Sequence, residues 1–376
     1  MTAKSNGRQR HLVLLGVGLI MALAGWGDAA LAAAPLATSQ PAADASKGKP
    51  GELIWASSGT QEGGRSVGKV VYSVAVDAQG VYVIGDKAGG AIIEKLNPRD
   101  GSPVWKPYQT MAGSNEGMHL AIDKHFLYAV AEPWMLEKRK LSDGSLIWQK
   151  KGEGGKPYTV VIDSVGAYMG GHRWQVEKRS LEDGSLLWRQ KGPSGVVLTA
   201  AIDATGVYFG GYDTEPGDQQ WRIEKRDLKD GSLIWVQNVN PSKQADKVYG
   251  MAVDATGVYA AGEDETAGTG GQWRIEKRSP KDGKLIWKQT NNPTGSLDKA
   301  HGLAADSTGV YIQGYQSGNQ WRAEKRSLTD GKLIWEALSV NGRLWYGITV
   351  DDEAVYLGGY TGGGHGGQWR VEKRAK

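Results

Sequence analysis

Short apolar runs separated by polar turns fill most of the chain, and one unit shows the pattern clearly. Within residues 247–287, an apolar run at 248–253 is followed by a tight turn and a second apolar run at 258–262. A polar, glycine-rich loop leads to 273–278, where apolar and polar residues alternate, and another turn leads to 284–287. Such short runs bounded by turn residues are typical of strands, and no helical period occurs. The unit is predicted to form four antiparallel strands.

The same unit returns seven times, marked by three phrases with a common spacing of 40 to 52 residues. An Asp is followed five residues later by a Tyr, from Asp77 and Tyr82 to Asp351 and Tyr356, and each unit also carries a Glu-Lys pair. Repeats of this length build blades or stacked arrays rather than one single-core domain. The phrase Asp-Gly-x-Leu-Ile-Trp, with small variations, ends on Trp55, Trp105, Trp148, Trp188, Trp235, Trp287 and Trp335.

The two ends of the repeat region complement each other. The last repeat begins at residue 344 and stops after its third strand, whereas a fourth strand stands alone at residues 51–55, before any first strand. Placing that strand in the gap completes seven blades and leaves no blade half-paired. We therefore predict an all-β fold, a seven-bladed β-propeller of four-stranded antiparallel blades over residues 51–376, closed by residues 51–55. An open solenoid is the alternative.

Three sequence segments resemble known propeller families. Ala75–Val83 (AVDAQGVYV) and Arg274–Arg278 (RIEKR) are similar to NHL and SBBP-type propeller repeats, and Thr329–Trp335 (TDGKLIW) resembles the second half of the tryptophan-docking motif of quinoprotein dehydrogenases. The resemblance implies a PQQ-like or NHL-like propeller. The chain departs from the dehydrogenases in having seven blades instead of eight, Lys325 and Ser327 in place of Ala and Asp, and no cysteine pair. No cofactor is predicted; pyrroloquinoline quinone (PQQ) is the one that the resemblance would imply.

The N-terminus has the anatomy of a secretory signal. Three basic residues precede an apolar run at 12–26, and small residues at 30–34 offer a cleavage site. We predict a signal peptide at 1–33 and a flexible linker at 34–50, which is rich in Ala, Ser, Pro and Lys. A membrane anchor is the alternative, although the run is short for a span. The mature chain is expected in the periplasm or outside the cell, without a membrane span.

Charge and cysteine content exclude some partners and chemistries. The formal net charge of +4 falls to +2 once residues 1–33, with three basic residues and Asp28, are removed. With no basic stripe, nucleic acid is not an expected partner. The absence of cysteine excludes a disulfide framework, which an exported domain of this size can do without because its core is large. A monomer is expected.

Residues present in every blade are interpreted as scaffold. The fourth-strand tryptophans are suited to wedge between blades, and the turn aspartates are expected to cap backbone N–H groups rather than to bind calcium. On one third strand, Arg222, Glu224 and Arg226 share a face, predicted to be a solvated ladder of weak ion pairs. A second packing ring, with ligand stacking as the alternative, is predicted for the third-strand tryptophans Trp134, Trp174, Trp221, Trp273, Trp321 and Trp369.

Function is expected where the blades differ. The residue five before each turn Asp enters the innermost strand near one mouth of the channel, in the neighbourhood of Lys156, Lys247, Lys299 and Glu116. This mixture of aromatic and hydrogen-bonding groups suits a small polar ligand, such as a sugar, a peptide or an anionic metabolite, or an envelope protein. The alternative is that these side chains only fill the channel. Together with Leu198, the predicted mouth positions are the binding candidates Tyr72, Met118, His119, Tyr158, Tyr249, His301 and Tyr346.

Catalytic patterns are sparse. No nucleophile elbow, zinc-protease helix or phosphate loop occurs in the sequence. Met118, His119 and His301 could offer a soft metal site, but adjacent strand residues alternate faces, so no metal is predicted. The sequence favours a non-catalytic binding propeller. The alternatives are an enzyme, either a quinoprotein-like oxidoreductase or an NHL-like lyase, and a structural surface or matrix protein.

Overall fold

The computed structural model describes residues 48–376 except 88–89, 267, 269 and 363–366, and omits the side chains of residues 340–341 and 343–346. The predicted signal peptide and most of the predicted linker therefore lie outside the described residues. The described residues form one compact unit. In the part of the chain that the structure describes, no helix is long and apolar enough to cross a membrane.

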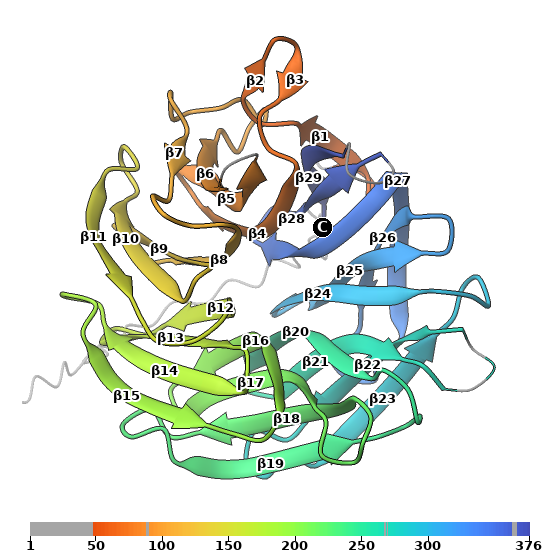
Figure 1. Cartoon of the computed structure of the whole chain (residues 1–376). Helices are drawn as coiled ribbons and strands as arrows, with labels where there is room; N and C mark the ends of the chain where they lie inside the picture. Colours follow the sequence, from red (N-terminus) through yellow and green to blue (C-terminus); the bar gives the residue numbers. More distant parts are fainter. Residues whose placement is uncertain (1–47, 88–89, 267, 269, 363–366) are drawn as a thin grey trace, which may run out of the picture. The chain divides into compact units, whose positions relative to one another are not determined.

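Seven antiparallel blades surround a common centre, as the sequence predicts (Figure 1). Consecutive first strands contact one another around the whole ring, including the contact of β27 with β4 that returns to the start. The first, innermost strands are β4 (Val70–Asp77), β8 (Gly117–Ile122), β12 (Pro157–Ile162), β16 (Gly195–Asp203), β20 (Lys247–Asp254), β24 (Lys299–Asp306) and the second part of β27 (Leu333–Val350). The second strands are β5 (Gly80–Lys87), β9 (Phe126–Ala131), β13 (Gly166–Gly171), β17 (Gly206–Asp213), β21 (Gly257–Asp264), β25 (Gly309–Gln316) and β28 (Ala354–Thr361).

The outer half of each blade contains the alternating strand and the tryptophan phrase. A small hairpin, β2 (Gln61–Glu62) and β3 (Arg65–Ser66), precedes the first blade. The third strands are β6 (Gly90–Leu96), β10 (Met135–Lys140), β14 (Gln175–Ser180), β18 (Gln220–Arg226), β22 (Gln272–Arg278), β26 (Gln320–Arg326) and β29 (Gln368–Ala375). The fourth strands are β7 (Gln109–Thr110), β11 (Leu146–Lys151), β15 (Leu186–Lys191), β19 (Leu233–Val239), β23 (Leu285–Asn291), the first part of β27, and β1 (Leu53–Ser57).

The predicted closure is confirmed. Strand β1 pairs antiparallel with β29, with Leu53 opposite Arg374 and Ser57 opposite Val371. The guanidinium of Arg374 also donates to the carbonyl of Gly51 at 2.8 Å. Strand β27 runs without a break from blade 6 into blade 7. Its first part pairs with β26 of blade 6, and its second part pairs with β28 of blade 7. Blades 6 and 7 therefore share one seven-stranded sheet.

The outer strand of blade 1 is the exception. The tryptophan phrase predicts it at residues 102–105, but only a single bridge between Leu96 and Pro103 forms there, and the two-residue strand β7 follows later. Proline has no N–H group, and this segment carries both Pro103 and Pro107, so a regular ladder cannot continue through it. Trp105 nevertheless remains buried, which preserves its contact between blades.

Neighbouring blades are joined by a repeated set of polar contacts. In blade 5, Asp254 accepts hydrogen bonds from two backbone N–H groups of its turn, at 2.7 and 2.9 Å, and from the hydroxyl of Tyr259 at 3.1 Å. Lys277 and the indole of Trp287 both donate to the carbonyl of Leu328 in blade 6, at 3.0 and 3.2 Å. The structural roles predicted for the turn aspartates and the fourth-strand tryptophans are confirmed. The third-strand tryptophans are at most 1 % exposed.

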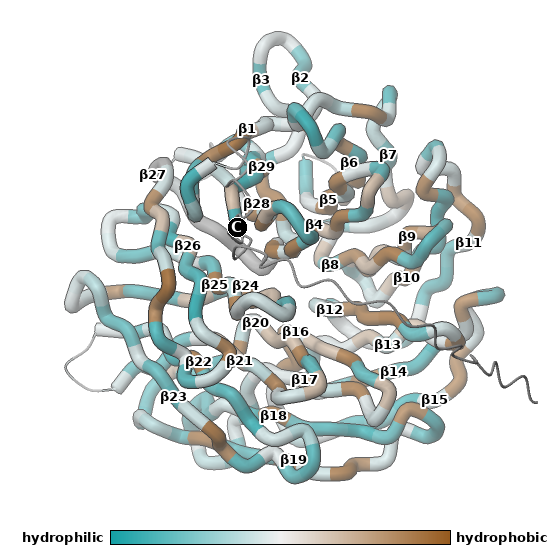
Figure 2. Tube along the Cα trace, turned by 180° about the vertical axis from the view of Figure 1, so that it is seen from behind, coloured by the Kyte–Doolittle hydropathy of each residue, from teal (hydrophilic) through white to brown (hydrophobic). Residues whose placement is uncertain are grey.

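Most apolar segments lie inside the blades, and polar segments follow the connecting loops (Figure 2). The Leu-Ile pairs of the outer strands are an exception, because they are apolar but exposed: Leu233 and Ile234 are 46 % and 47 % exposed.

The charged face of the third strand is polar but buried. Glu224 is 0 % exposed, and Arg222 and Arg226 are 7 % and 6 % exposed. The prediction of a solvated ladder is therefore wrong.

The ion pairs are buried because the preceding blade covers this face. Asn291 on the outer strand of blade 5 donates to Glu324 of blade 6 at 2.8 Å, and Arg139 of blade 2 donates to the carbonyl of Thr110 in blade 1 at 2.8 Å. Charges in such a place need complete hydrogen bonding. Arg226 makes these hydrogen bonds within its own blade. Its Nε donates to the Glu224 carboxylate at 2.5 Å, and its Nη1 donates to the carbonyl of Gly231 at 2.9 Å.

Candidate functional site

The predicted mouth positions share a backbone feature that the sequence reasoning did not anticipate. In the pairing of first and second strands, the residue five before the turn Asp is the extra residue of a β-bulge in blades 1 to 6, whereas His119 pairs regularly with Val130. In blade 5, for example, Val248 and Gly250 pair with consecutive residues and Tyr249 is skipped. A bulge bends its strand and re-aims a side chain, and is common beside functional sites. The residues skipped in this way are Tyr72, Met118, Tyr158, Leu198, Tyr249 and His301.

In blade 7 the corresponding shift falls between Leu344 and Ile348, a segment that contains Tyr346. The side chain of Tyr346 lies outside the described residues, as does that of Trp345. Both positions therefore stay predictions.

A glycine that recurs in the second strands is the sequence feature that could have predicted the bulges. A Cβ atom on Gly262 would lie 1.9 Å from the carbonyl oxygen of Lys247, and one on Gly314 would lie 2.0 Å from that of Lys299. The bulge brings the two backbones too close for any side chain at these positions. The sequence reasoning passed over this recurrent glycine.

Three predicted mouth residues are buried or half-buried. Met118 is 2 % exposed and belongs to an apolar cluster with Trp134 and Val160, and Leu198 is 7 % exposed. His119 is half-buried in β8. Burial lowers the pKa of His119 to about 4, with a smaller opposing effect from a hydrogen bond to the backbone of Val160. The imidazole of His119 is therefore neutral at pH 7.

This histidine predicts an acid-sensitive contribution to stability. An unfolded histidine titrates near 6.5 and His119 near 4, so the unfolded chain binds the proton first. The contribution is complete above about pH 6.5 and is lost as the pH falls through about 4. We expect His119→Gln to reduce the fall in unfolding temperature between pH 7 and pH 4, measured by calorimetry. His125→Gln, at an exposed turn, is the control; equal slopes for wild type and His119→Gln would contradict the assignment.

The mouth residues of blades 5 and 6 form a closed aromatic stack. The ring of His301 lies between those of Tyr249 and Tyr315, with centroid separations of 4.6 and 5.4 Å. All three side chains are buried, at 8 %, 5 % and 5 % exposure. The structure thus brings the predicted residues Tyr249 and His301 together, but in a packed arrangement.

A buried carboxylate anchors this stack. Glu263 is 0 % exposed and accepts a hydrogen bond from the hydroxyl of Tyr249 at 3.0 Å. Lys247 lies 3.3 Å from Glu263 and Lys299 is in direct contact with it. Burial opposes the charge of Lys299, but the Glu263 carboxylate outweighs it and raises the pKa of this lysine above its usual range. The positive charges of Lys247 and Lys299 are therefore paired with a carboxylate of the same sector.

The mouth residues of blades 1 and 3 border a more open sector, in which Met118 of blade 2 stays buried. Tyr72 and Tyr158 are half-buried, and Lys156 forms an ion pair with Glu116. Burial, and then the nearby carboxylates of Asp86 and Glu116, raises the pKa of the Tyr72 hydroxyl well above its usual range. Both tyrosines are therefore neutral hydrogen-bonding groups, with charged residues close by.

His172 links this sector to a neighbouring cavity. Its Nδ1 accepts the backbone N–H of Lys156 at 3.3 Å, and its Nε2 lies 3.1 Å from the hydroxyl of Tyr158. Burial, followed by the charge of Lys156, lowers the pKa of His172. A neutral ring that accepts at Nδ1 carries its proton on Nε2, so Nε2–H donates to Tyr158.

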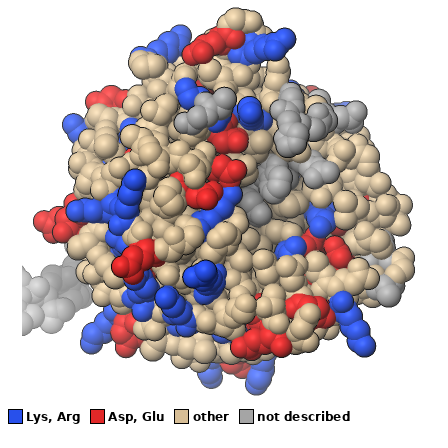
Figure 3. All heavy atoms as spheres, viewed as in Figure 1, with Lys and Arg blue, Asp and Glu red and all other residues tan. Residues whose placement is uncertain are grey.

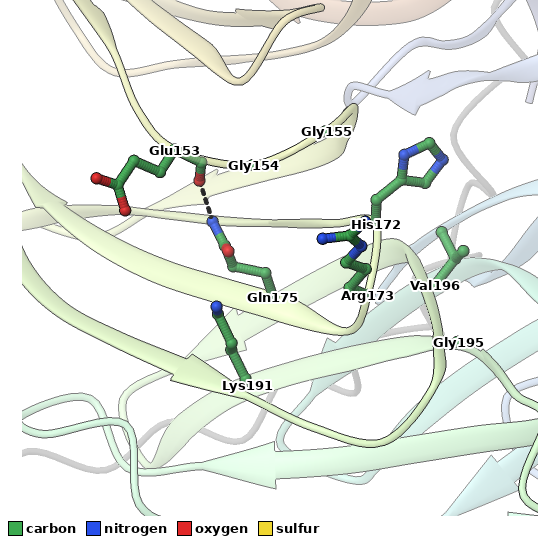
Figure 4. A pocket seen from close by; sticks show the side chains of 9 residues that line it. All are labelled: Glu153, Gly154, Gly155, His172, Arg173, Gln175, Lys191, Gly195 and Val196. Carbon is green, nitrogen blue, oxygen red and sulfur yellow. Dashed lines mark hydrogen bonds between the residues drawn. The ribbon is translucent and has the colours of Figure 1, made fainter.

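The cavity has a volume of about 600 Å³ and opens between the loops that enter blades 3 and 4. Figure 4 shows the side chains of Gln175 and Lys191 extending from neighbouring strands toward the loop at 153–155, with Arg173 in the same space. The sequence reasoning did not single out these three residues. The cavity is lined by Glu153, Gly154, Gly155, His172, Arg173, Gln175, Lys191, Gly195 and Val196.

The described residues do not fit a calcium-dependent quinone. Among them, no group of three or more His, Cys, Asp or Glu side chains is placed to hold a metal ion. Calcium requires several converging oxygen ligands, and a flat quinone requires an open aromatic face. The described third-strand tryptophans are almost fully buried and offer no such face.

Comparisons with known proteins agree with the fold. The family model described as outer membrane protein assembly factor BamB matches residues 89–270. No curated protein matches the sequence. Three solved structures resemble the chain at low identity, which shows the β-propeller fold alone. The family model covers a little under half of the chain, so the similarity to PQQ-like repeat propellers holds at the level of the fold.

These structures are of different origin. The WD40 β-propeller domain of Doa1 has a TM-score of 0.59 and 12 % identity, covering 82 % of this chain and 93 % of its own. The computationally designed protein Ika8 has a TM-score of 0.56 and 12 % identity, covering 87 % and 100 %. BamB from Moraxella catarrhalis has a TM-score of 0.51 and 15 % identity, covering 82 % and 86 %.

Proposed function

We propose that the chain is an exported, non-catalytic propeller of the cell envelope that binds a polypeptide partner at its channel mouth. The bulges are the observation that carries this proposal. They occur at equivalent positions of the repeat. The residue they re-aim is a tyrosine in blades 1, 3 and 5 but Met118, Leu198 or His301 in blades 2, 4 and 6. Unlike side chains on a uniform, rigid scaffold are the usual arrangement of a binding surface.

The open sector of blades 1 to 3 is the part of the mouth best suited to a partner. Tyr72 and Tyr158 offer large, rigid side chains with a polar tip, the type enriched in protein interfaces. The ion pair of Lys156 with Glu116 lies beside them. On the face seen in Figure 3, acidic and basic residues are interspersed, a pattern that favours a polypeptide over a uniformly charged polymer.

The family model and the predicted signal peptide support the location and the kind of partner. The family model is described as an outer membrane protein assembly factor. The basic residues, apolar run and small residues at 1–33 are the features of an export signal. The family model and the export signal both fit a chain that is exported to the periplasm or secreted, loses its signal peptide and acts by contacting other proteins.

We expect the double variant Tyr72→Ala/Tyr158→Ala to lose partner binding at least tenfold, because truncated interface tyrosines commonly have effects of this size. The purified chain would capture its partner from an envelope extract of the source cells, and the affinity for the purified partner would then be measured by calorimetry. Leu233→Ala/Ile234→Ala, on the exposed outer strand, is the matched control.

Two outcomes would count against the proposal. Equal affinity of the mouth variant and the control variant would move the partner surface elsewhere on the molecule. A small molecule retained by the wild-type chain in native mass spectrometry, with no polypeptide captured, would replace the partner by a small polar ligand.

A further inference from the structure

We propose that the cavity beside the mouth, between the loops entering blades 3 and 4, is a binding site for an oxyanion, a carboxylate or phosphate group. The inference goes beyond the proposed partner surface, because Tyr72 and the other bulged residues do not line this cavity. It rests on the charges, donors and backbone geometry around the cavity.

The first observation is an excess of uncompensated positive charge. Arg173 and Lys191 are exposed and line the cavity. Within the described part of the chain, neither has an acidic side chain within 4.0 Å. The one acidic residue of the lining, Glu153, has its carboxylate 3.0 Å from the guanidinium of Arg189. Two cations without protein counter-charges that share one cavity attract an anion.

The second observation is a glycine-rich loop whose backbone lies close against the site. A Cβ atom on Gly155 would lie 2.7 Å from Nδ1 of His172, and one on Gly154 would lie 2.9 Å from the ring of Trp134. A side chain at either position would have to displace one of these rings, so glycine lets the loop backbone lie close to the cavity. Gln175 holds the loop in place, because its amide donates to the carbonyl of Glu153 at 2.6 Å.

The third observation is that the third-strand indoles beside the cavity, like that of Trp369 in blade 7, lack the acceptor found in blades 4 to 6. In blades 4 and 5 the indole N–H groups of Trp221 and Trp273 donate to a carbonyl of the next blade, at 2.7 and 3.3 Å. The indole nitrogens of Trp134 and Trp174 are buried and have no acceptor among the described residues. A Cβ atom on Gly192 would lie 2.3 Å from the ring of Trp174, which places this indole under the second bordering loop. Buried donors that lack acceptors are rare in proteins.

The fourth observation is the backbone of the hairpin that presents Arg173. Arg173 and Trp174 have φ values of 59° and 47°. This two-residue turn normally takes Asn and Gly, because positive φ is disfavoured for other residues. Strain of this kind often marks functional sites. Here it buries the Trp174 ring while it keeps the Arg173 side chain at the cavity.

Together these features match an oxyanion. Arginine forms paired hydrogen bonds with carboxylate or phosphate, and lysine adds a point charge. Two sources could supply the group: the C-terminal carboxylate of a polypeptide, or a free phosphate. The probes chosen below distinguish them.

The test is calorimetric titration of the purified chain with three probes: inorganic phosphate, the peptide acetyl-Gly-Gly-Phe with a free carboxylate, and the same peptide as its amide. The variants are Arg173→Asn, which removes the charge but keeps a residue that tolerates positive φ, and Lys191→Gln. The control is Lys151→Gln, an exposed cation at the same end of the outer strand of blade 2. Unchanged unfolding temperatures establish that each variant is folded.

We expect phosphate or the free-acid peptide to bind, each site variant to weaken that binding about tenfold, and Lys151→Gln to leave it unchanged. Binding of the free acid but not the amide assigns the site to a C-terminal carboxylate; binding of phosphate alone assigns it to a free phosphate. Equal binding of acid and amide, no binding of any probe, or equal losses in the site and control variants would overturn the proposal. Tyr72→Ala is expected to keep anion binding, so failure of the partner surface and failure of this site are separable.

Discussion

Deletion of residues 1–57 is expected to prevent stable closure of the ring, whereas deletion of residues 1–47 is expected to leave the unfolding temperature unchanged. The first deletion removes β1 and exposes the edge of β29. It also removes Trp55, which is 8 % exposed and donates to the carbonyl of Pro98 in blade 1 at 3.1 Å. Loss of one buried tryptophan costs about 3–5 kcal/mol, and the exposed edge invites intermolecular pairing. We expect aggregation or a much lower unfolding temperature in scanning fluorimetry and size-exclusion chromatography.

A peptide supplied in trans tests the same contact from the other side. A synthetic peptide of residues 48–58 can add to the free edge of β29 as a strand. It is expected to raise the unfolding temperature of the 1–57 deletion and to leave that of the intact chain unchanged. A deletion variant that unfolds at the wild-type temperature without peptide would show that β1 does not close the ring.

The ring and its closure follow from the sequence because local patterns determine them. Asp254 must cap its own turn, and Trp287 is too large to remain in solvent, whatever the blade packs against. Seven copies of these constraints predict seven blades. The spare strand at residues 51–55 then has one place to pair.

The site follows less directly because it depends on what each residue faces. Strand alternation assigns Glu224 and the two flanking arginines to one face, but it does not reveal that the preceding blade covers that face. The bulge at Tyr249 depends on its partner strand, where Gly262 allows the close approach. Arg173 and Trp174 form a hairpin turn with positive φ values, but neither is a glycine, so the sequence does not indicate this turn.

The burial of the third-strand ion pairs turns a weak surface interaction into a strong constraint. Blade 1 shows that the fold tolerates another solution. There Glu94 is flanked by Ile92 and Leu96 instead of arginines, and the backbone N–H of Thr60 donates to it. Burial raises the pKa of Glu94. A buried glutamate with one hydrogen-bonded neighbour and two apolar ones is therefore compatible with a closed blade.

Glu224→Gln is expected to destabilise the propeller by about 3–5 kcal/mol, because it leaves Arg226 buried without its counter-charge and leaves Arg222 only the more distant carboxylate of Asp213, at 3.6 Å. Both guanidinium groups now contact Glu224, at 2.8 and 2.5 Å. Asp282→Asn is the matched control: its ion pair with Lys284 spans 3.2 Å, but the side chains are 40 % and 81 % exposed. Such surface pairs contribute little to stability, because water screens them. Urea unfolding followed by tryptophan fluorescence measures both.

A third variant separates the loss of charge pairing from a general packing defect. Arg222→Ile/Glu224→Val/Arg226→Leu replaces the triad by apolar residues, two of them as in blade 1. Asp213, which lies 3.6 Å from Arg222, keeps its hydrogen bonds from Gln220 and from the backbone N–H of Glu215. Exchange of a buried ion-pair triad for apolar side chains is often neutral or stabilising, because it removes the desolvation cost of all the charges. We expect this variant to regain most of the stability that Glu224→Gln loses. If Glu224→Gln costs no more than Asp282→Asn, water reaches the triad and the burial argument fails; if the apolar triad is the least stable of the three, the ion pairs stabilise the blade beyond what apolar packing can replace.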